Sequence, residues 1–200
     1  MKKGCLIIAG VVVIVLLIAG FAVQGSYNDI VAKEQEVNQL WAQVENVYQR
    51  RADLIPNLVA TVKGYAAHES GVFESVAASR AQVGSIRITQ DLLNNPAEFQ
   101  KFQQAQAGLS GALSRLLAVA ENYPELKANQ NFLELQSQLE GSENRIATER
   151  RRFNEGAQAY NTRIKQFPAT LVARFFGFNE KQYFQSAPGS EKVPVVNFGK

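Results

Sequence analysis

The spacing of apolar residues divides the chain into a uniformly apolar start and a longer body with a helical repeat. Residues 4–23 form a run of 20 without a charged or strongly polar side chain. As an α-helix this run spans about 30 Å, which matches the hydrocarbon core of a bilayer. It predicts a single transmembrane anchor whose apolar side chains face lipid: Leu6, Val11, Val12, Val13, Ile14, Val15, Leu16, Leu17, Ile18 and Phe21.

Beyond residue 26 apolar residues recur at alternating steps of three and four, the repeat of an amphipathic helix. This stripe extends over residues 27–76 and is interrupted only by Glu34, Arg51 and Glu69. Pro56 lies within the stripe, and a proline removes a backbone donor and clashes with the preceding turn. We therefore expect a kink or a break near residues 51–56.

Two more long helices and a short one follow. Asn95-Pro96 predicts a helix start, with asparagine as the cap and proline in the first turn. A third helix over about residues 127–166 has an apolar or aromatic residue at every seventh position: Phe132, Leu139, Ile146, Phe153, Tyr160 and Phe167. Such a strict heptad favours antiparallel, coiled-coil-like packing. Residues 169–176 predict a short amphipathic helix rich in aromatics.

These elements predict an all-α fold, in which an N-terminal transmembrane helix precedes an antiparallel, coiled-coil-like bundle of three to four long helices. We divide the chain into an anchor at residues 1–25, a helical bundle at 26–185 and an extended tail at 186–200. No alternating strand pattern bounded by turns is present, so a sheet is not expected.

Composition removes several classes of function. Lys and Arg number 21 against 18 Asp and Glu, and without Lys2 and Lys3 the balance is 19 to 18. A body with so little net charge is not expected to bind nucleic acid. One cysteine and one histidine leave no disulfide framework and no Cys/His metal site. No phosphate loop or nucleophile elbow occurs. We expect no catalytic residue, cofactor, metal or small-molecule substrate, and hence no enzyme.

Charge also predicts the topology. Lys2 and Lys3 precede the apolar run, whereas residues 24–40 carry one lysine and three acidic residues. The positive-inside rule then places the N-terminus in the cytoplasm and the body outside it. A cleaved signal peptide is the alternative, because Gly20-Phe21-Ala22 offers small residues at suitable places, although the apolar run exceeds the usual length of such a signal.

Arg51 is the most unusual charged residue, because it falls on the apolar stripe and needs a partner there. A second polar patch interrupts apolar positions of the third helix. We interpret the two as a structural polar network that fixes helix register, built from Arg50, Arg51, Asp53, Glu140, Glu143, Asn144 and Arg145. The alternative is a recognition site for a ligand or a partner.

The motifs in these segments resemble those of the LemA family of membrane-anchored bacterial proteins. The resemblance rests on the segment 49–59 (QRRADLIPNLV), on 121–128 (ENYPELKA), on 143–147 (ENRIA), on Arg151-Arg152-Phe153-Asn154 and on Phe167-Pro168. It covers nearly the whole chain in order. It implies an N-terminal anchor, a helical bundle and no well-established enzyme activity. A related protein of magnetosome-forming bacteria, linked to making membrane compartments, implies a role in membrane organisation.

Two classes of function remain. The first is a membrane-anchored scaffold of the cell envelope that associates with itself and with other envelope proteins. Its candidate assembly surface is Tyr27, Ile30, Val37, Trp41, Phe175, Phe176, Phe178, Tyr183, Phe184, Val195 and Phe198. The second is an extracytoplasmic ligand-binding or sensory bundle that acts through a partner protein. The C-terminal segments could instead fold back on their own bundle, which needs no second chain.

Overall fold

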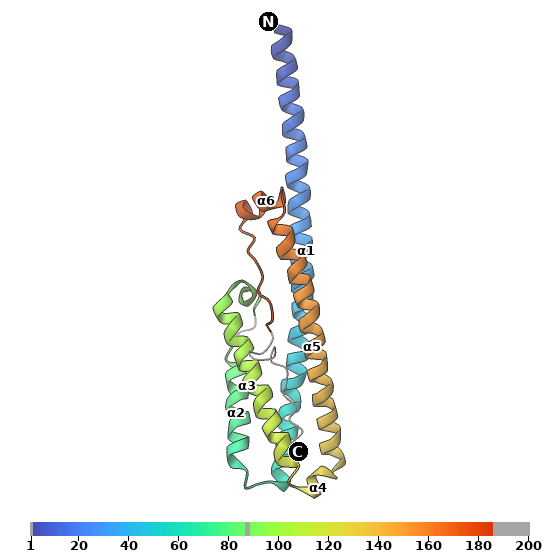
Figure 1. The fold of residues 1–200 in the computed structure, drawn as a ribbon, viewed down its shortest axis with the longest axis vertical. Helices are drawn as coiled ribbons and strands as arrows, with labels where there is room; N and C mark the ends of the chain where they lie inside the picture. The colour runs from blue at the N-terminus through green and yellow to red at the C-terminus, as the bar shows by residue number, and fades with distance from the viewer. Residues whose placement is uncertain (1, 87–88, 186–200) are drawn as a thin grey trace, which may run out of the picture.

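The N-terminal half of the chain is dominated by one helix of 64 residues, α1 (Lys2–Tyr65). The computed structural model describes residues 2–86 and 89–185, without the side chains of residues 2–7, 9, 90 and 91. Figure 1 shows that α1 extends alone beyond the other helices at its N-terminal end and lies within the bundle at its C-terminal end. Its first part is long and apolar enough to cross a membrane.

Pro56 does not break α1, so of the kink or break expected from the sequence the break does not occur. The helix continues through it to Tyr65. Proline removes one backbone hydrogen bond, but Ile55 and Leu58 on either side are buried in the same core. Packing of the apolar stripe on both sides of Pro56 therefore offsets the missing bond and keeps the helix in register.

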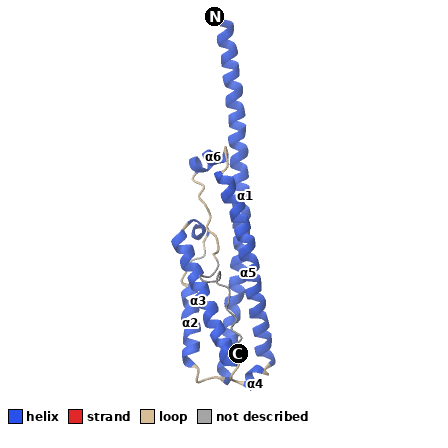
Figure 2. Cartoon of the chain, viewed as in Figure 1, coloured by secondary structure: helices blue, strands red, loops and turns tan. Residues whose placement is uncertain are grey.

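Five further helices and one 3-10 turn complete the described part of the chain, which contains no strand (Figure 2). They are α2 (Ser70–Gly84), η1 (Gln90–Asn94), α3 (Pro96–Ala120), α4 (Pro124–Lys127), α5 (Gln130–Lys165) and α6 (Ala169–Phe176). α5 lies antiparallel beside α1, and α2 pairs with α3 (Figure 1). The all-α bundle predicted from the sequence is confirmed.

Side-chain caps fix where two of the long helices begin. The Asn95 side chain accepts hydrogen bonds from the backbone N–H groups of Ala97 and Glu98, at 3.1 and 3.3 Å, as the Asn-Pro pair predicts. The Asn129 side chain accepts one from Phe132 at 3.1 Å. The third long helix therefore starts at residue 130, later than expected, because residues 124–127 form the separate turn α4.

Two apolar clusters fill the bundle. The one nearer the apolar segment joins α1, α3, α5 and α6 around Trp41, and the distant one joins α1, α2, α3 and α5 around Leu58. The heptad residues from Phe132 to Tyr160 are buried in these clusters.

Two details of the predicted repeats are wrong. Phe167 is exposed because α5 ends at Lys165, before the next heptad position. The stripe of the first helix does not continue to residue 76 in one helix, since the chain turns at residues 66–69 and Val76 belongs to α2.

Candidate functional site

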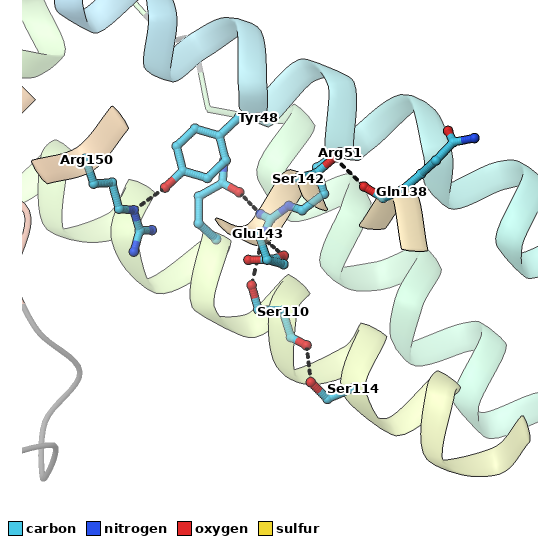
Figure 3. Close-up of polar contacts among 9 residues, drawn as sticks. Tyr48, Arg51, Ser110, Ser114, Gln138, Ser142, Glu143 and Arg150 are labelled. Carbon is cyan, nitrogen blue, oxygen red and sulfur yellow. Dashed lines mark hydrogen bonds and ion pairs between the residues drawn. The ribbon is translucent and has the colours of Figure 1, made fainter. Parts of the chain in front are cut away.

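A buried arginine lies where α1, α3 and α5 meet. Arg51 on α1 is only 1% exposed. One of its terminal nitrogens, Nη1, donates to the Ser110 hydroxyl at 2.7 Å and to a carboxylate oxygen of Glu143 at 2.8 Å. The other, Nη2, donates to the Gln106 side-chain oxygen (Figure 3 draws the contacts to α3 and α5). Its guanidinium carbon lies 5.3 Å from the centre of the Tyr48 ring.

The helical repeat explains why these groups converge. Gln106 and Ser110 are four residues apart on α3 and share one face of it. Glu143 lies on α5 between the buried residues Leu139 and Ile146, so its side chain is held at the same face. The Glu143 side chain is 40% exposed, whereas that of Arg51 is buried. Water therefore reaches the pair mainly at the Glu143 carboxylate.

A second arginine extends this cluster along α5. Arg150 Nε donates to the Tyr48 hydroxyl at 2.6 Å, and its guanidinium lies 4.8 Å from the Phe184 ring centre. Burial raises the pKa of the Tyr48 hydroxyl, and Arg150 beside it opposes that change. Tyr48 is thus held neutral between Arg51 and Arg150, and its ring lies between the polar cluster and Phe102 of the aromatic core.

A cleft of about 390 Å³ opens beside this cluster, between α3 and α5. Arg51, Glu143 and Arg150 line it together with a row of amides from α3: Gln100, Gln103 and Gln104. Its lining contains no histidine or cysteine, and Ser110 already accepts a hydrogen bond from Arg51. Such a surface offers hydrogen bonds and positive charge to a polar ligand.

A second buried charge lies nearer the apolar segment. Lys181 Nζ donates to Glu34 at 2.7 Å and to the Asn94 side chain at 2.9 Å. Asn161 on α5 bonds both the N–H and the carbonyl of Lys181, at 2.8 and 2.9 Å. These bonds fasten the segment after α6 along the bundle, because they fix its backbone and its charge at once.

All three polar interruptions of the predicted stripe therefore have partners from distant parts of the chain. Glu34 pairs with Lys181, Arg51 pairs with Glu143, and Glu69 accepts a hydrogen bond from the Tyr123 hydroxyl at 3.3 Å.

The model of the LemA family matches residues 40–198. The chain belongs to the LemA family.

Curated relatives place this LemA-family chain among membrane-associated helical proteins. Magnetosome protein MamQ of Magnetospirillum gryphiswaldense is 28% identical over 186 residues, covering 85% of this chain and 68% of the relative. Magnetosome protein MamQ 1 of Paramagnetospirillum magneticum matches to the same extent. Protein LemA of Metamycoplasma hominis is 22% identical over 175 residues, covering 88% of this chain and 75% of the relative.

The structure brings together only part of the polar network expected for this LemA-family chain. Arg51 and Glu143 meet, whereas Arg50 and Arg145 are exposed. The other three expected members make local surface contacts within their own helices. Asp53 accepts from Gln49, Glu140 accepts from Gln136, and the Asn144 carbonyl accepts from Thr148. These five residues lie on the outer faces of α1 and α5, so they cannot reach the buried guanidinium.

Sequence reasoning missed Gln106 and Ser110. Gln106 is a polar residue on the apolar face of α3, between Phe102 and Leu109, and is buried. The same signal that marked Arg51, a polar residue at an apolar position, was thus present on α3. Ser110 gave no comparable signal, because a serine in a helix is commonly solvated.

Much of the candidate assembly surface is covered within the same chain. Ile30, Val37 and Trp41 are buried, so the expectation of a free surface does not hold for them. The Trp41 ring contacts Phe102 of α3, Phe153 of α5 and, at 6.0 Å between centres, Phe184. Phe184 is itself buried there and Phe178 is half-buried, so the segment after α6 does fold back on its own bundle.

The remaining predicted positions stay at the surface or outside the described residues. Tyr27, Phe175, Phe176 and Tyr183 are exposed. Val195 and Phe198 lie outside the described residues, as does the side chain of Leu6. The anchor residues Val11–Ile18 and Phe21 are all exposed, as lipid-facing side chains must be.

Proposed function

We propose that this LemA-family protein is a non-enzymatic, membrane-anchored scaffold of the cell envelope, which associates with itself and organises membrane or envelope proteins. The observation that carries the proposal is α1, since one unbroken helix forms both the apolar segment and the longest element of the bundle. Its 64 residues extend about 96 Å. A body joined to its anchor without a loop is held at a fixed place on the membrane, which suits a structural support.

The chemistry of the bundle supports a structural role. The buried charges of Arg51 and Lys181 are each matched by a carboxylate and further hydrogen bonds. His68 is exposed, and the described residues contain no group of three His, Cys, Asp or Glu side chains that could hold a metal ion. The buried polar groups thus serve to join helices.

We place the N-terminus in the cytoplasm and the bundle outside it, because Lys2 and Lys3 precede the apolar segment. Protease added to intact spheroplasts should then degrade the bundle, while lysed cells serve as the control for protease activity. A bundle protected until lysis would reverse the orientation, and a mature N-terminus near Val23 would mean that the anchor is cleaved.

Self-association is tested by mass. Because Ile30, Val37 and Trp41 are covered internally, we assign the contact between copies to the lipid-embedded part of α1 and to the tail at 186–200. The full-length protein in nanodiscs should have a protein mass of at least twice 22.1 kDa, and the fragment beginning at Ser26 should contain fewer copies per particle. Truncation after Gln185 should lower the mass if the tail bridges chains. A full-length protein that stays monomeric over a wide concentration range would reject self-association.

A ligand-binding or sensory bundle is the second candidate, and the cleft between α3 and α5 favours it. Arg150 and the α3 glutamines would hold a small polar or acidic molecule there. Such a ligand should raise the melting temperature in a saturable way, because it binds only the folded state. The rise should be absent from an Arg150→Ala variant. An equal rise in that variant would place the ligand elsewhere.

A further inference from the structure

The exposed apolar side chains of the described bundle are not scattered. Beyond the apolar segment, only four large apolar residues are more than half exposed, namely Phe167 at 79%, Leu171 at 58%, Phe175 at 83% and Phe176 at 52%. All four belong to α6 or directly precede it. Elsewhere in the described bundle no large apolar residue exceeds the 43% of Leu133. Exposed apolar surface of this density marks a site of interaction.

α6 is built to present this surface. Ala169, Val172 and Ala173 are buried and fix one face of α6 against α1 and α5. Leu171 and Phe175 are four residues apart, so they lie together on the other side of the helix. Gly177 then ends α6 in the left-handed conformation, with φ +78°. We call Phe167, Leu171 and Phe175 the α6 ridge.

The position of α6 along α1 indicates what covers the ridge. The Phe176 ring lies 4.8 Å from the Tyr27 ring on α1. Tyr27 is four residues beyond Val23, the last residue of the apolar run, which is about 6 Å along the helix axis. Figure 1 shows α6 across the end of the bundle, at the level beyond which only α1 continues. α6 therefore lies at the height of the membrane–water interface.

We propose that α6 is an interfacial helix, whose ridge inserts into the boundary between headgroups and acyl chains of the same bilayer that α1 crosses. Aromatic side chains concentrate at this depth, because their apolar bodies leave water while the interface stays hydrated. Arg174 on α6 is exposed and offers a guanidinium to lipid phosphates, whereas Lys165 is exposed but paired with Glu180 at 2.7 Å.

A bilayer fits the ridge better than a second copy does, since Phe175 contacts Phe176 and Phe176 contacts Tyr27, only four residues from the end of the apolar run of α1. The inference deepens the proposed scaffold and rests on its membrane anchoring. A single helix can swivel on its axis and tilt. A second contact at α6, on one side of α1, would fix the rotation and the tilt of the bundle on the membrane.

The insertion of α6 is tested by tryptophan fluorescence in vesicles whose lipids are brominated near the headgroup end of the acyl chain. Bromine quenches tryptophan only at close range. The native Trp41 is buried and lies about 27 Å beyond Val23, so the full-length parent protein supplies a constant background. Phe175→Trp reports on the ridge. Leu133→Trp, exposed near the far end of the bundle, is the matched control, and Phe21→Trp is the control inside the anchor.

Phe175→Trp should lose roughly half of its added emission in brominated vesicles relative to unbrominated ones, as a side chain held about 5–10 Å inside the interface would. Leu133→Trp should lose none. Unquenched Phe175→Trp beside quenched Phe21→Trp would contradict the insertion of α6 and leave the anchor intact. If aqueous acrylamide also fails to quench that residue, the ridge is covered by a second protein copy. If Phe21→Trp is also unquenched, the membrane anchoring itself fails, and the inference fails with it.

Discussion

Replacing Arg51 by alanine tests whether the buried arginine joins the three helices. The change leaves the buried Gln106 side-chain oxygen without its hydrogen-bond donor. A buried polar group without a partner costs about 1–3 kcal/mol. Glu143 is 40% exposed, so water can hydrate its carboxylate, and the loss falls below the limit of about 3–5 kcal/mol for a fully buried pair. Including the packing lost with the arginine stem, we expect Arg51→Ala to lower the free energy of unfolding by about 3 kcal/mol.

Thermal unfolding of the full-length protein in detergent, followed by circular dichroism, measures this effect. A loss of about 3 kcal/mol lowers the melting temperature of a domain of this size by about 6–12 °C. Arg50→Ala is the matched control, because Arg50 is the same residue type on the same turn but is exposed. It should change stability by less than about 0.5 kcal/mol.

The double change Arg51→Met with Gln106→Leu separates the charge from the packing. It removes the guanidinium and its buried amide partner together, and leaves Glu143 facing water. Because apolar replacements of buried ion pairs are often neutral or stabilising, this variant should recover most of the stability that Arg51→Ala loses. An Arg51→Ala protein that melts at the same temperature as Arg50→Ala would refute the reasoning.

Four further substitutions test the packing and the capping of the helices. The Tyr160 hydroxyl is buried without a hydrogen-bond partner in the described chain, and burial raises its pKa above 10. Tyr160→Phe should therefore raise the free energy of unfolding by about 1 kcal/mol. It should also reduce the loss of stability above pH 10, because only the unfolded protein ionises this tyrosine there. If the free energy of unfolding falls with alkaline pH equally in both proteins, this reasoning is wrong. Gly156→Val should lower the free energy of unfolding by about 1–3 kcal/mol, because a side chain at this position meets Leu40. Gly141→Ala places a methyl group in open space and should raise the free energy of unfolding by about 0.5–1 kcal/mol in the same denaturant titration. Equal effects of the two changes would mean that α1 and α5 do not approach closely at Gly156. Asn95→Ala should cost about 1 kcal/mol through the lost cap, and no loss would show that α3 does not depend on it.

The helices were predictable because their signals are local. The heptads of α5 and the Asn95 cap of α3 depend on residues within a turn or two. The end of α1 was not predictable from its stripe, since the apolar period stays in phase across the turn at residues 66–69 even though the helix does not. Phe167 shows the same limit, because a heptad position has no meaning beyond the end of α5.

The Arg51–Glu143 pair of the candidate site could be predicted from the sequence, but its partners on α3 could not. A charge on an apolar stripe must have a partner, so Arg51 could be singled out, and Glu143 was among the acidic groups considered. Which face of α3 meets Arg51 depends on how the α2–α3 pair docks, and no local pattern encodes that. The cover of Trp41 was unpredictable for the same reason, because Phe184 comes from a segment without periodicity that Lys181 and Asn161 hold in place.

The central claim is that α1 joins the membrane anchor to the bundle as one rigid helix, and a distance between two spin labels tests it most directly. With Cys5 replaced by serine, Phe21→Cys and Asn46→Cys put labels on exposed positions of α1, inside the anchor and inside the bundle. In nanodiscs an unbroken helix predicts a narrow distribution of distances centred on about 38 Å. A broad distribution, or one centred at clearly shorter distances, would reveal a hinge between anchor and bundle and contradict the account.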